Sequence, residues 1–131
     1  MRLFIRCTGP DATPVDALPI YIFDKALHEN FRSVFLVTNA AVPYLRASTN
    51  DPNILTAAST GAYVGYPAAA AYGSTKAAIV PLTRVAAIDL APVIRVNACS
   101  PGTVDTRLVP RIGQPGDVAN LLAWLASSQA S

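Results

Sequence analysis

Short apolar runs alternate with long stretches of helical periodicity along the 131 residues of this chain. Such alternation predicts an α/β fold in which right-handed crossovers join parallel strands. The expected elements are strands at residues 3–7, 53–58 and 93–99, and helices at about residues 23 or 24 to 47, 69–90 and 115–127. In sheets of this kind, ligands bind beyond the carboxyl ends of the strands. Residues that directly follow the expected strands are therefore the first candidates for a functional site.

Prolines lie at informative places in the expected helices. Pro43 should end or kink the first helix near its last turn, because proline removes a backbone hydrogen bond. Pro81 lies inside the second helix, where it costs about 3 kcal/mol unless the helix bends. Pro115 suits the first turn of the last helix.

Composition and charge restrict the class of protein. Apolar residues make up 52% of the chain and charged residues 14%, which indicates one globular domain with a real core. The net charge of +2 comes without a basic cluster, so we expect no nucleic-acid partner. No apolar run reaches about 18 residues, so no membrane partner is expected. We expect a cytoplasmic protein, since Leu3–Ile5 is too short for a signal-peptide core.

The two cysteines, Cys7 and Cys99, fall in the first and third expected strands. If another strand lies between these two, their backbones are about 9–10 Å apart. That separation exceeds the limit of about 7 Å for a disulfide. We therefore expect free, buried thiols, and two cysteines make no metal site.

Tyr72 and Lys76 are four residues apart in the second expected helix, so their side chains share one face. A positive charge beside a phenol favours its ionised form and prepares it to exchange protons. Ser59 follows the second expected strand and precedes Tyr72 in the chain. A hydroxyl, a phenol and an amine together indicate proton transfer to or from a carbonyl or alcohol oxygen.

The spacing of Tyr72 and Lys76 also has an ordinary interpretation, since short motifs of this kind arise by chance. The two residues could lie on the solvated face of a helix, and Ser59 could simply cap a turn. A hydrolase is not indicated, because the chain has no G-x-S-x-G elbow. A Ser-x-x-Lys dyad that ends at Lys76 would need serine at position 73, which is Gly73.

Several further blocks of sequence occur in a recognisable order around this pair. These blocks are Asn30, residues 35–45, residues 54–59, Gly65 with Pro67, residues 76–84, residues 94–106 and residues 114–127. In this order and register, with Tyr72 and Lys76, they resemble the short-chain dehydrogenase/reductase family. The resemblance implies a single domain over residues 1–131 with a partial, Rossmann-like (doubly wound) parallel sheet. About three strands, two long helices and a short C-terminal helix are expected.

The resemblance also implies an activity, an oxidoreductase that transfers hydride between NAD or NADP and a carbonyl or alcohol. Tyr72 would be the general acid or base, and Ser59 would hydrogen-bond the substrate oxygen. Lys76 would favour ionised tyrosine and bind the nicotinamide ribose, while Asn30 would hold a water that links Lys76 to solvent. The expected cofactor-binding residues are Tyr72, Lys76, Pro101, Val104 and Thr106.

Part of the family pattern is missing from this sequence. The seven glycines contain no glycine-rich phosphate-binding turn, so we expect a truncated domain with a weak or incomplete site for NAD or NADP. The segment between Thr106 and Gln114 is much shorter than the family's substrate lid. The first strand would lack its usual neighbour and present an open edge.

Two functional hypotheses remain open at this point, together with the alternative of a fragment or a gene-model error. The chain is either an oxidoreductase with intact acid–base residues or a catalytically inactive relative that acts as an association module. By resemblance, the two long helices would form a homo-oligomer. A small-molecule carbonyl or alcohol is the expected substrate, but neither its identity nor the choice between NAD and NADP can be read from the residues.

Overall fold

A computed structural model describes residues 2–4, 13–105 and 113–130. The first helical stretch is continuous from Ile20 to Arg46 and contains a π-helical turn. The elements are β1 (Arg2–Phe4), α1 (Ile20–Ala26), the π-helix η1 (Leu27–Arg32), α2 (Ser33–Arg46), β2 (Asn53–Ala57), the 3-10 helix η2 (Thr60–Ala62), α3 (Ala70–Leu90), β3 (Arg95–Cys99), α4 (Pro115–Leu125) and the 3-10 helix η3 (Ser128–Ala130).

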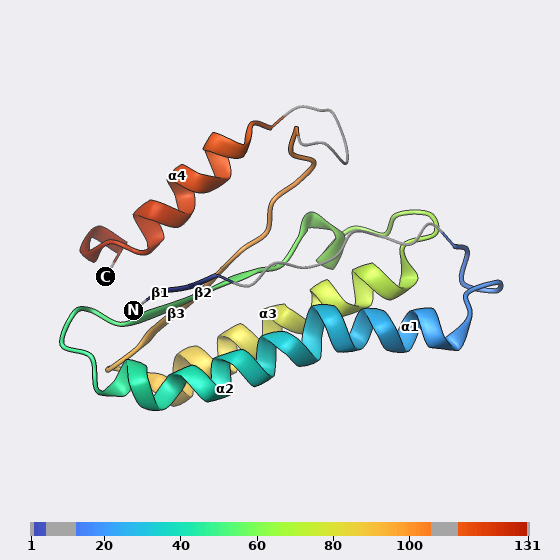
Figure 1. Cartoon of the computed structure of the whole chain (residues 1–131). Coiled ribbons are helices and arrows are strands. Elements are labelled where there is room, and N and C mark those ends of the chain that lie inside the picture. Colours follow the sequence, from blue (N-terminus) through green and yellow to red (C-terminus); the bar gives the residue numbers. More distant parts are fainter. Residues whose placement is uncertain (1, 5–12, 106–112, 131) are drawn as a thin grey trace.

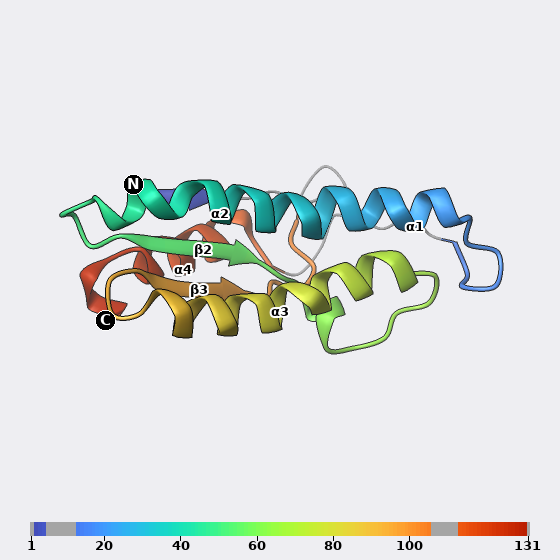
Figure 2. The ribbon, with the colours of Figure 1, turned by 90° about the horizontal axis from the view of Figure 1, so that it is seen from below.

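The three strands form one sheet in the order β1-β2-β3. All of them are parallel, as the alternation predicted. In the register, Leu3 pairs with Ile54, and Ile54 pairs with Val96. α2 and α3 lie side by side along one face of the sheet, and α4 lies on the opposite face (Figures 1 and 2). The expected fold class, a partial doubly wound sheet with two long helices and a short C-terminal helix, is confirmed.

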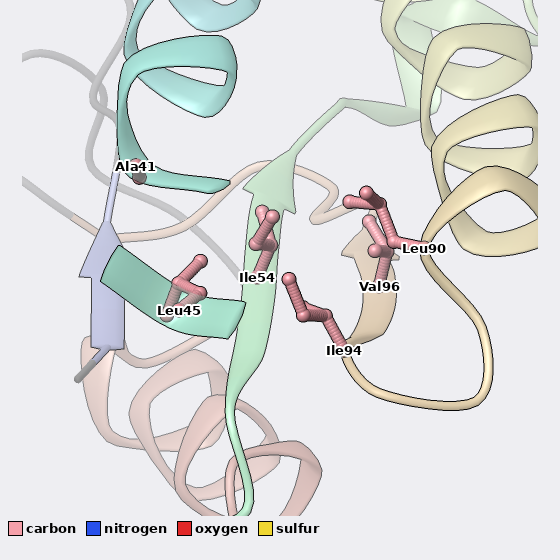
Figure 3. Packing of buried hydrophobic residues seen from close by; sticks show 6 residues of the cluster. All are labelled: Ala41, Leu45, Ile54, Leu90, Ile94 and Val96. Carbon is pink, nitrogen blue, oxygen red and sulfur yellow. The ribbon is translucent and has the colours of Figure 1, made fainter. Parts of the chain in front are cut away.

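A compact hydrophobic cluster joins the sheet to these two helices. Ile54 and Val96 come from the strands, and Leu45 and Leu90 come from the last turns of α2 and α3 (Figure 3). Leu45, Ile54 and Ile94 are each at most 1% exposed. A second cluster, Val34, Ala58 and Ile79, lies nearer the carboxyl end of the sheet. The two clusters together hold α2 and α3 against the sheet and the segment that follows β2.

The element boundaries differ from the expected ones at the start of the first helix and in the first strand. The first helix begins at Ile20, directly after Pro19, and it was expected to begin three or four residues later. Its end at Arg46 is close to Pro43, as expected, and Pro81 lies inside α3. The first strand covers Arg2–Phe4, and Cys7 lies outside the described residues.

The C-terminal end of α4 is anchored to the amino ends of β2 and β3. The Arg95 guanidinium donates to the backbone oxygens of Leu125, at 3.1 Å, and Ser127, at 3.0 Å. It also forms an ion pair with Asp51 at 2.6 Å. The Asn53 amide donates to the Ala126 oxygen at 3.2 Å. These bonds satisfy carbonyls that a helix end leaves without partners inside the helix. We call this group the α4 clamp.

Helices long and apolar enough to cross a membrane do not occur among the described residues.

Candidate active site

The candidate site lies where the polypeptide leaves the carboxyl ends of β2 and β3. Ser59 follows β2, and Pro101 follows β3. The two turns are tied together, since the Thr60 N–H donates to the Pro101 oxygen at 3.0 Å. Tyr72 lies in the first turn of α3, which packs against both η2 and β3. The topology therefore brings Ser59 and Tyr72 to the carboxyl end of the sheet.

The side chains of Tyr72 and Lys76 meet on one face of α3, as their spacing predicted. The Lys76 Nζ lies over the Tyr72 ring, 5.7 Å from its centroid. Lys76 is only 3% exposed, and its Nζ donates to the Ala57 oxygen at 2.7 Å. An ammonium carries three donors. The hydrogen bond to β2 fixes the lysine ammonium beside the Tyr72 ring.

Ser59 and Tyr72 come together beside Gly61. The Ser59 Oγ accepts a hydrogen bond from the Gly61 N–H at 3.1 Å, so the hydroxyl proton can be donated to another acceptor. The point that a Cβ on Gly61 would occupy lies 3.5 Å from the Ser59 Oγ and 3.5 Å from the Tyr72 Cε1. A hydroxyl and a phenol ring therefore border the same small space.

Asn30 reaches the site indirectly, through a residue that the sequence analysis missed. It lies in the π-helical turn η1 and is 1% exposed. Its Nδ2 donates to the Thr75 Oγ1 at 3.4 Å, and that hydroxyl donates to the Tyr72 backbone oxygen at 2.8 Å. Thr75 is completely buried. Its position beside Lys76, on the same face of the helix as Tyr72, was the available signal.

The expected cofactor residues are only partly described. Pro101 and Val104 are half-buried in the segment after β3, where Val104 bridges to Gly113. Thr106 lies outside the described residues. The seven glycines of the chain contain no glycine-rich turn of the kind that binds a pyrophosphate.

Cys99 ends β3 and is buried close to Lys76. Burial raises the pKa of its thiol, and this effect outweighs a backbone hydrogen bond and the Lys76 charge, which both lower it. The expected free, buried thiol is confirmed for Cys99.

Comparison with known proteins places this geometry in a family. A family model described as enoyl-(acyl carrier protein) reductase matches residues 8–113. The chain is 32% identical to dehydrogenase/reductase SDR family member 4 of Sus scrofa, over 84% of this chain and 46% of that protein. The chain belongs to the short-chain dehydrogenase/reductase family. It is also 31% identical to an A-factor type gamma-butyrolactone 1'-reductase of Streptomyces virginiae, over 96% of this chain and 57% of that one.

Solved structures of short-chain dehydrogenases/reductases have the same fold. A 3-ketoacyl-(acyl-carrier-protein) reductase from Brucella melitensis, complexed with NADH, gives a TM-score of 0.91 at 32% identity. The similarity covers 98% of this chain and 60% of that structure. A 4-hydroxyisoleucine dehydrogenase complexed with NADH gives 0.90 at 26% identity. The chain spans about half the length of the curated relatives.

Proposed function

We propose that this chain carries the acid–base centre of an NAD(P)-dependent oxidoreductase that interconverts a carbonyl and an alcohol. The observation that supports this function best is the convergence of three groups. The Ser59 hydroxyl and the Tyr72 ring border one space, and the Lys76 ammonium lies over that ring. Membership of the short-chain dehydrogenase/reductase family is consistent with this assignment.

In the direction of reduction, each residue has a defined task. Tyr72 donates the phenol proton to the carbonyl oxygen as a general acid. Ser59 donates a hydrogen bond to the same oxygen and stabilises the negative charge that develops there. Lys76 stabilises the phenolate that remains on Tyr72. When bound, NAD(P)H would supply the hydride that the carbonyl carbon needs to become an alcohol. Oxidation reverses the steps, with Tyr72 as the base.

The remaining expected residues would position this centre. Asn30 would hold a water that links Lys76 to solvent. Pro101, Val104 and Thr106 would contact the nicotinamide end of the cofactor, and Lys76 would bind its ribose. Because this sequence has no glycine-rich phosphate turn, we expect a weak or incomplete site for NAD or NADP.

Replacement of the phenol hydroxyl tests this function. Tyr72→Phe should lower kcat for reduction of a simple ketone with NADH or NADPH by at least about 100-fold, because it removes the general acid. Tyr44→Phe is the matched control, since Tyr44 lies on α2 and is 69% exposed. The decrease in NAD(P)H absorbance measures the activity of both variants. Equal activity of Tyr72→Phe and wild-type protein would exclude the proposed role.

A second candidate function is association without catalysis. Large apolar side chains are exposed on α2 and α3, among them Phe35 at 49%, Val85 at 54% and Ile88 at 77%. Such a surface suits a homo-oligomer formed through the two long helices. If the wild-type chain associates but turns over no ketone with either cofactor, this second function replaces the first.

A further inference from the structure

The buried hydroxyl of Thr75 joins two parts of the candidate active site. Thr75 lies on α3 directly before Lys76, and no part of it is exposed. Its Oγ1 accepts a hydrogen bond from the Asn30 Nδ2 at 3.4 Å and donates one to the Tyr72 backbone oxygen at 2.8 Å. Asn30 comes from η1, which packs against α3. One series of hydrogen bonds therefore runs from η1 to the turn that carries Tyr72.

The donors and acceptors in this series allow one orientation of the Asn30 amide. A hydroxyl carries a single proton, and a backbone oxygen can only accept, so the Thr75 proton belongs to the Tyr72 oxygen. Towards Asn30, the hydroxyl oxygen must therefore accept, and only the amide nitrogen can donate to it. An amide turned by half a rotation would place two acceptor oxygens face to face in a buried position, which is unfavourable. Thr75 thus decides which end of the amide faces α3.

The backbone oxygen of Tyr72 belongs to the turn that brings the two expected catalytic residues of α3 together. In an α-helix, an oxygen accepts from the N–H four residues later, which is here that of Lys76. A carbonyl oxygen has two lone pairs, so the Thr75 hydroxyl can bond to it as well. The same turn is tied to β2 through the Lys76 ammonium and the Ala57 oxygen. Hydrogen bonds to η1 and to β2 therefore hold this turn from two sides.

We propose that Thr75 is a positioning residue that fixes the orientation of the Asn30 amide relative to Tyr72 and Lys76. The inference rests on the proposed function and adds a residue to it, since in that function Asn30 would hold a water next to Lys76. An ammonium only donates hydrogen bonds, so such a water accepts from Lys76 and donates its own protons onward. The amide oxygen is the end that can receive them, and Thr75 keeps this oxygen turned away from its own hydroxyl.

Side-chain NMR of the full chain tests the orientation without any turnover. Nuclear Overhauser contacts should join the Asn30 Nδ2 protons to the side-chain protons of Thr75. Because the Nδ2 protons are buried and hydrogen-bonded, they should also exchange slowly with solvent. Absence of these contacts in the wild-type protein would overturn the inference, whether or not any variant folds.

Two substitutions at position 75 separate the hydroxyl from the shape of the side chain. Thr75→Val removes the hydroxyl and should speed exchange of the Asn30 Nδ2 protons by at least about tenfold, because their acceptor is lost. Thr75→Ser keeps a hydroxyl and should restore slow exchange. Wild-type exchange in the valine variant, or fast exchange in the serine variant, would overturn the inference.

Thr83→Val is the matched control on the same helix. Thr83 is also buried on α3, and its hydroxyl donates to the Ile79 backbone oxygen at 2.8 Å. It shares a hydrogen bond with the Thr56 hydroxyl at 2.9 Å. The control therefore removes a comparable buried hydroxyl that bonds to neither Asn30 nor Tyr72. It should leave the Asn30 signals as in the wild-type protein, and equal changes in Thr75→Val and Thr83→Val would contradict a specific role of Thr75.

Kinetics show whether the orientation matters for the reaction. In reduction of a simple ketone, Thr75→Val should lower kcat about tenfold, because misplaced groups slow the chemical step. Its KM should stay within about twofold of the wild-type value, since Thr75 does not bind substrate. Thr75→Ser and Thr83→Val should keep kcat near the wild-type value. A raised KM with unchanged kcat in Thr75→Val would overturn the positioning role. If Tyr72→Phe shows wild-type activity, the proposed function fails, and the NMR experiment still decides the orientation of Asn30.

Discussion

At the scale of single residues, the site depends on polar groups that are buried close together. Lys76 is held by the Ala57 oxygen, and Ala57 pairs in register with Cys99. The ammonium is therefore near a thiol whose pKa is raised by burial. Tyr72, Lys76 and Ser59 could be predicted from the sequence, because helical spacing and strand ends fix their places. The role of Thr75 could not, because a pattern of residues does not show which partner a buried hydroxyl finds.

The raised pKa of Cys99 predicts slow alkylation in the native protein. Iodoacetamide reacts with thiolate, so labelling at Cys99 should become appreciable only above the ordinary value of 9.0. Because the folded-state pKa is the higher one, loss of the thiol proton should also lower the free energy of unfolding as the pH rises above that value. Peptide mass spectrometry after pulsed labelling resolves Cys99 from Cys7.

The charge of Lys76 provides a test of this explanation. Lys76 lowers the pKa of the thiol, so Lys76→Met should move the pH of half-maximal labelling further upward. Native-state labelling of Cys99 at neutral pH, as fast as in urea, would contradict the predicted protection.

At the scale of elements, helix and strand existence followed from periodicity, but two local features did not. The π-helical turn at residues 27–32 lies inside a continuous helical stretch. Phe31 and Val34 still pack into one cluster, so their spacing in the sequence resembles that of an ordinary α-helix. The α4 clamp also has no sequence pattern, since Arg95 and Asn53 reach carbonyls about 30 and 73 residues away. Tertiary contacts decide both.

Loss of the clamp should release α4 before the rest of the domain unfolds. Arg95→Met removes charge-assisted bonds to Leu125 and Ser127 and should lower the free energy of unfolding by about 2–3 kcal/mol. Trp124, the single tryptophan of the chain, lies on α4 and reports its release. In urea, tryptophan fluorescence should change at a lower concentration than circular dichroism.

The control for this prediction is Arg84→Met, at an exposed position of α3. In this variant, the fluorescence and circular dichroism transitions should have the same midpoints in urea as in the wild-type protein. A clamp variant whose fluorescence and circular dichroism transitions coincide at the wild-type midpoint would show that α4 does not depend on Arg95.

At the scale of the whole molecule, the sheet has β1 at one edge and β3 at the other among the described strands. The parallel direction was predictable, because strand–helix alternation leaves few topologies. The surface was less predictable. The family resemblance implied association through the two long helices, but the exposure of Phe35 and Ile88 is known only from the packing.

This exposed surface predicts self-association through α2 and α3. The double variant Phe35→Glu/Ile88→Glu should shift the chain toward monomer, because two charges replace apolar contact area. Light scattering after size-exclusion chromatography over a range of concentrations measures the mass. Leu121→Glu is the control on α4, which lies on the other face of the sheet (Figure 1). A mass that is the same for wild-type protein and double variant would exclude this interface.

The α4 clamp lies at one end of β2 and β3, and the candidate catalytic groups lie at the other. Asn53 and Arg95 begin the two strands, whereas Ser59 and Pro101 follow their far ends. The contacts that hold α4 and the candidate catalytic groups thus lie at opposite ends of the same two strands. Substitutions at the clamp that raise thermal stability should therefore leave the positions of Ser59 and Tyr72 unchanged.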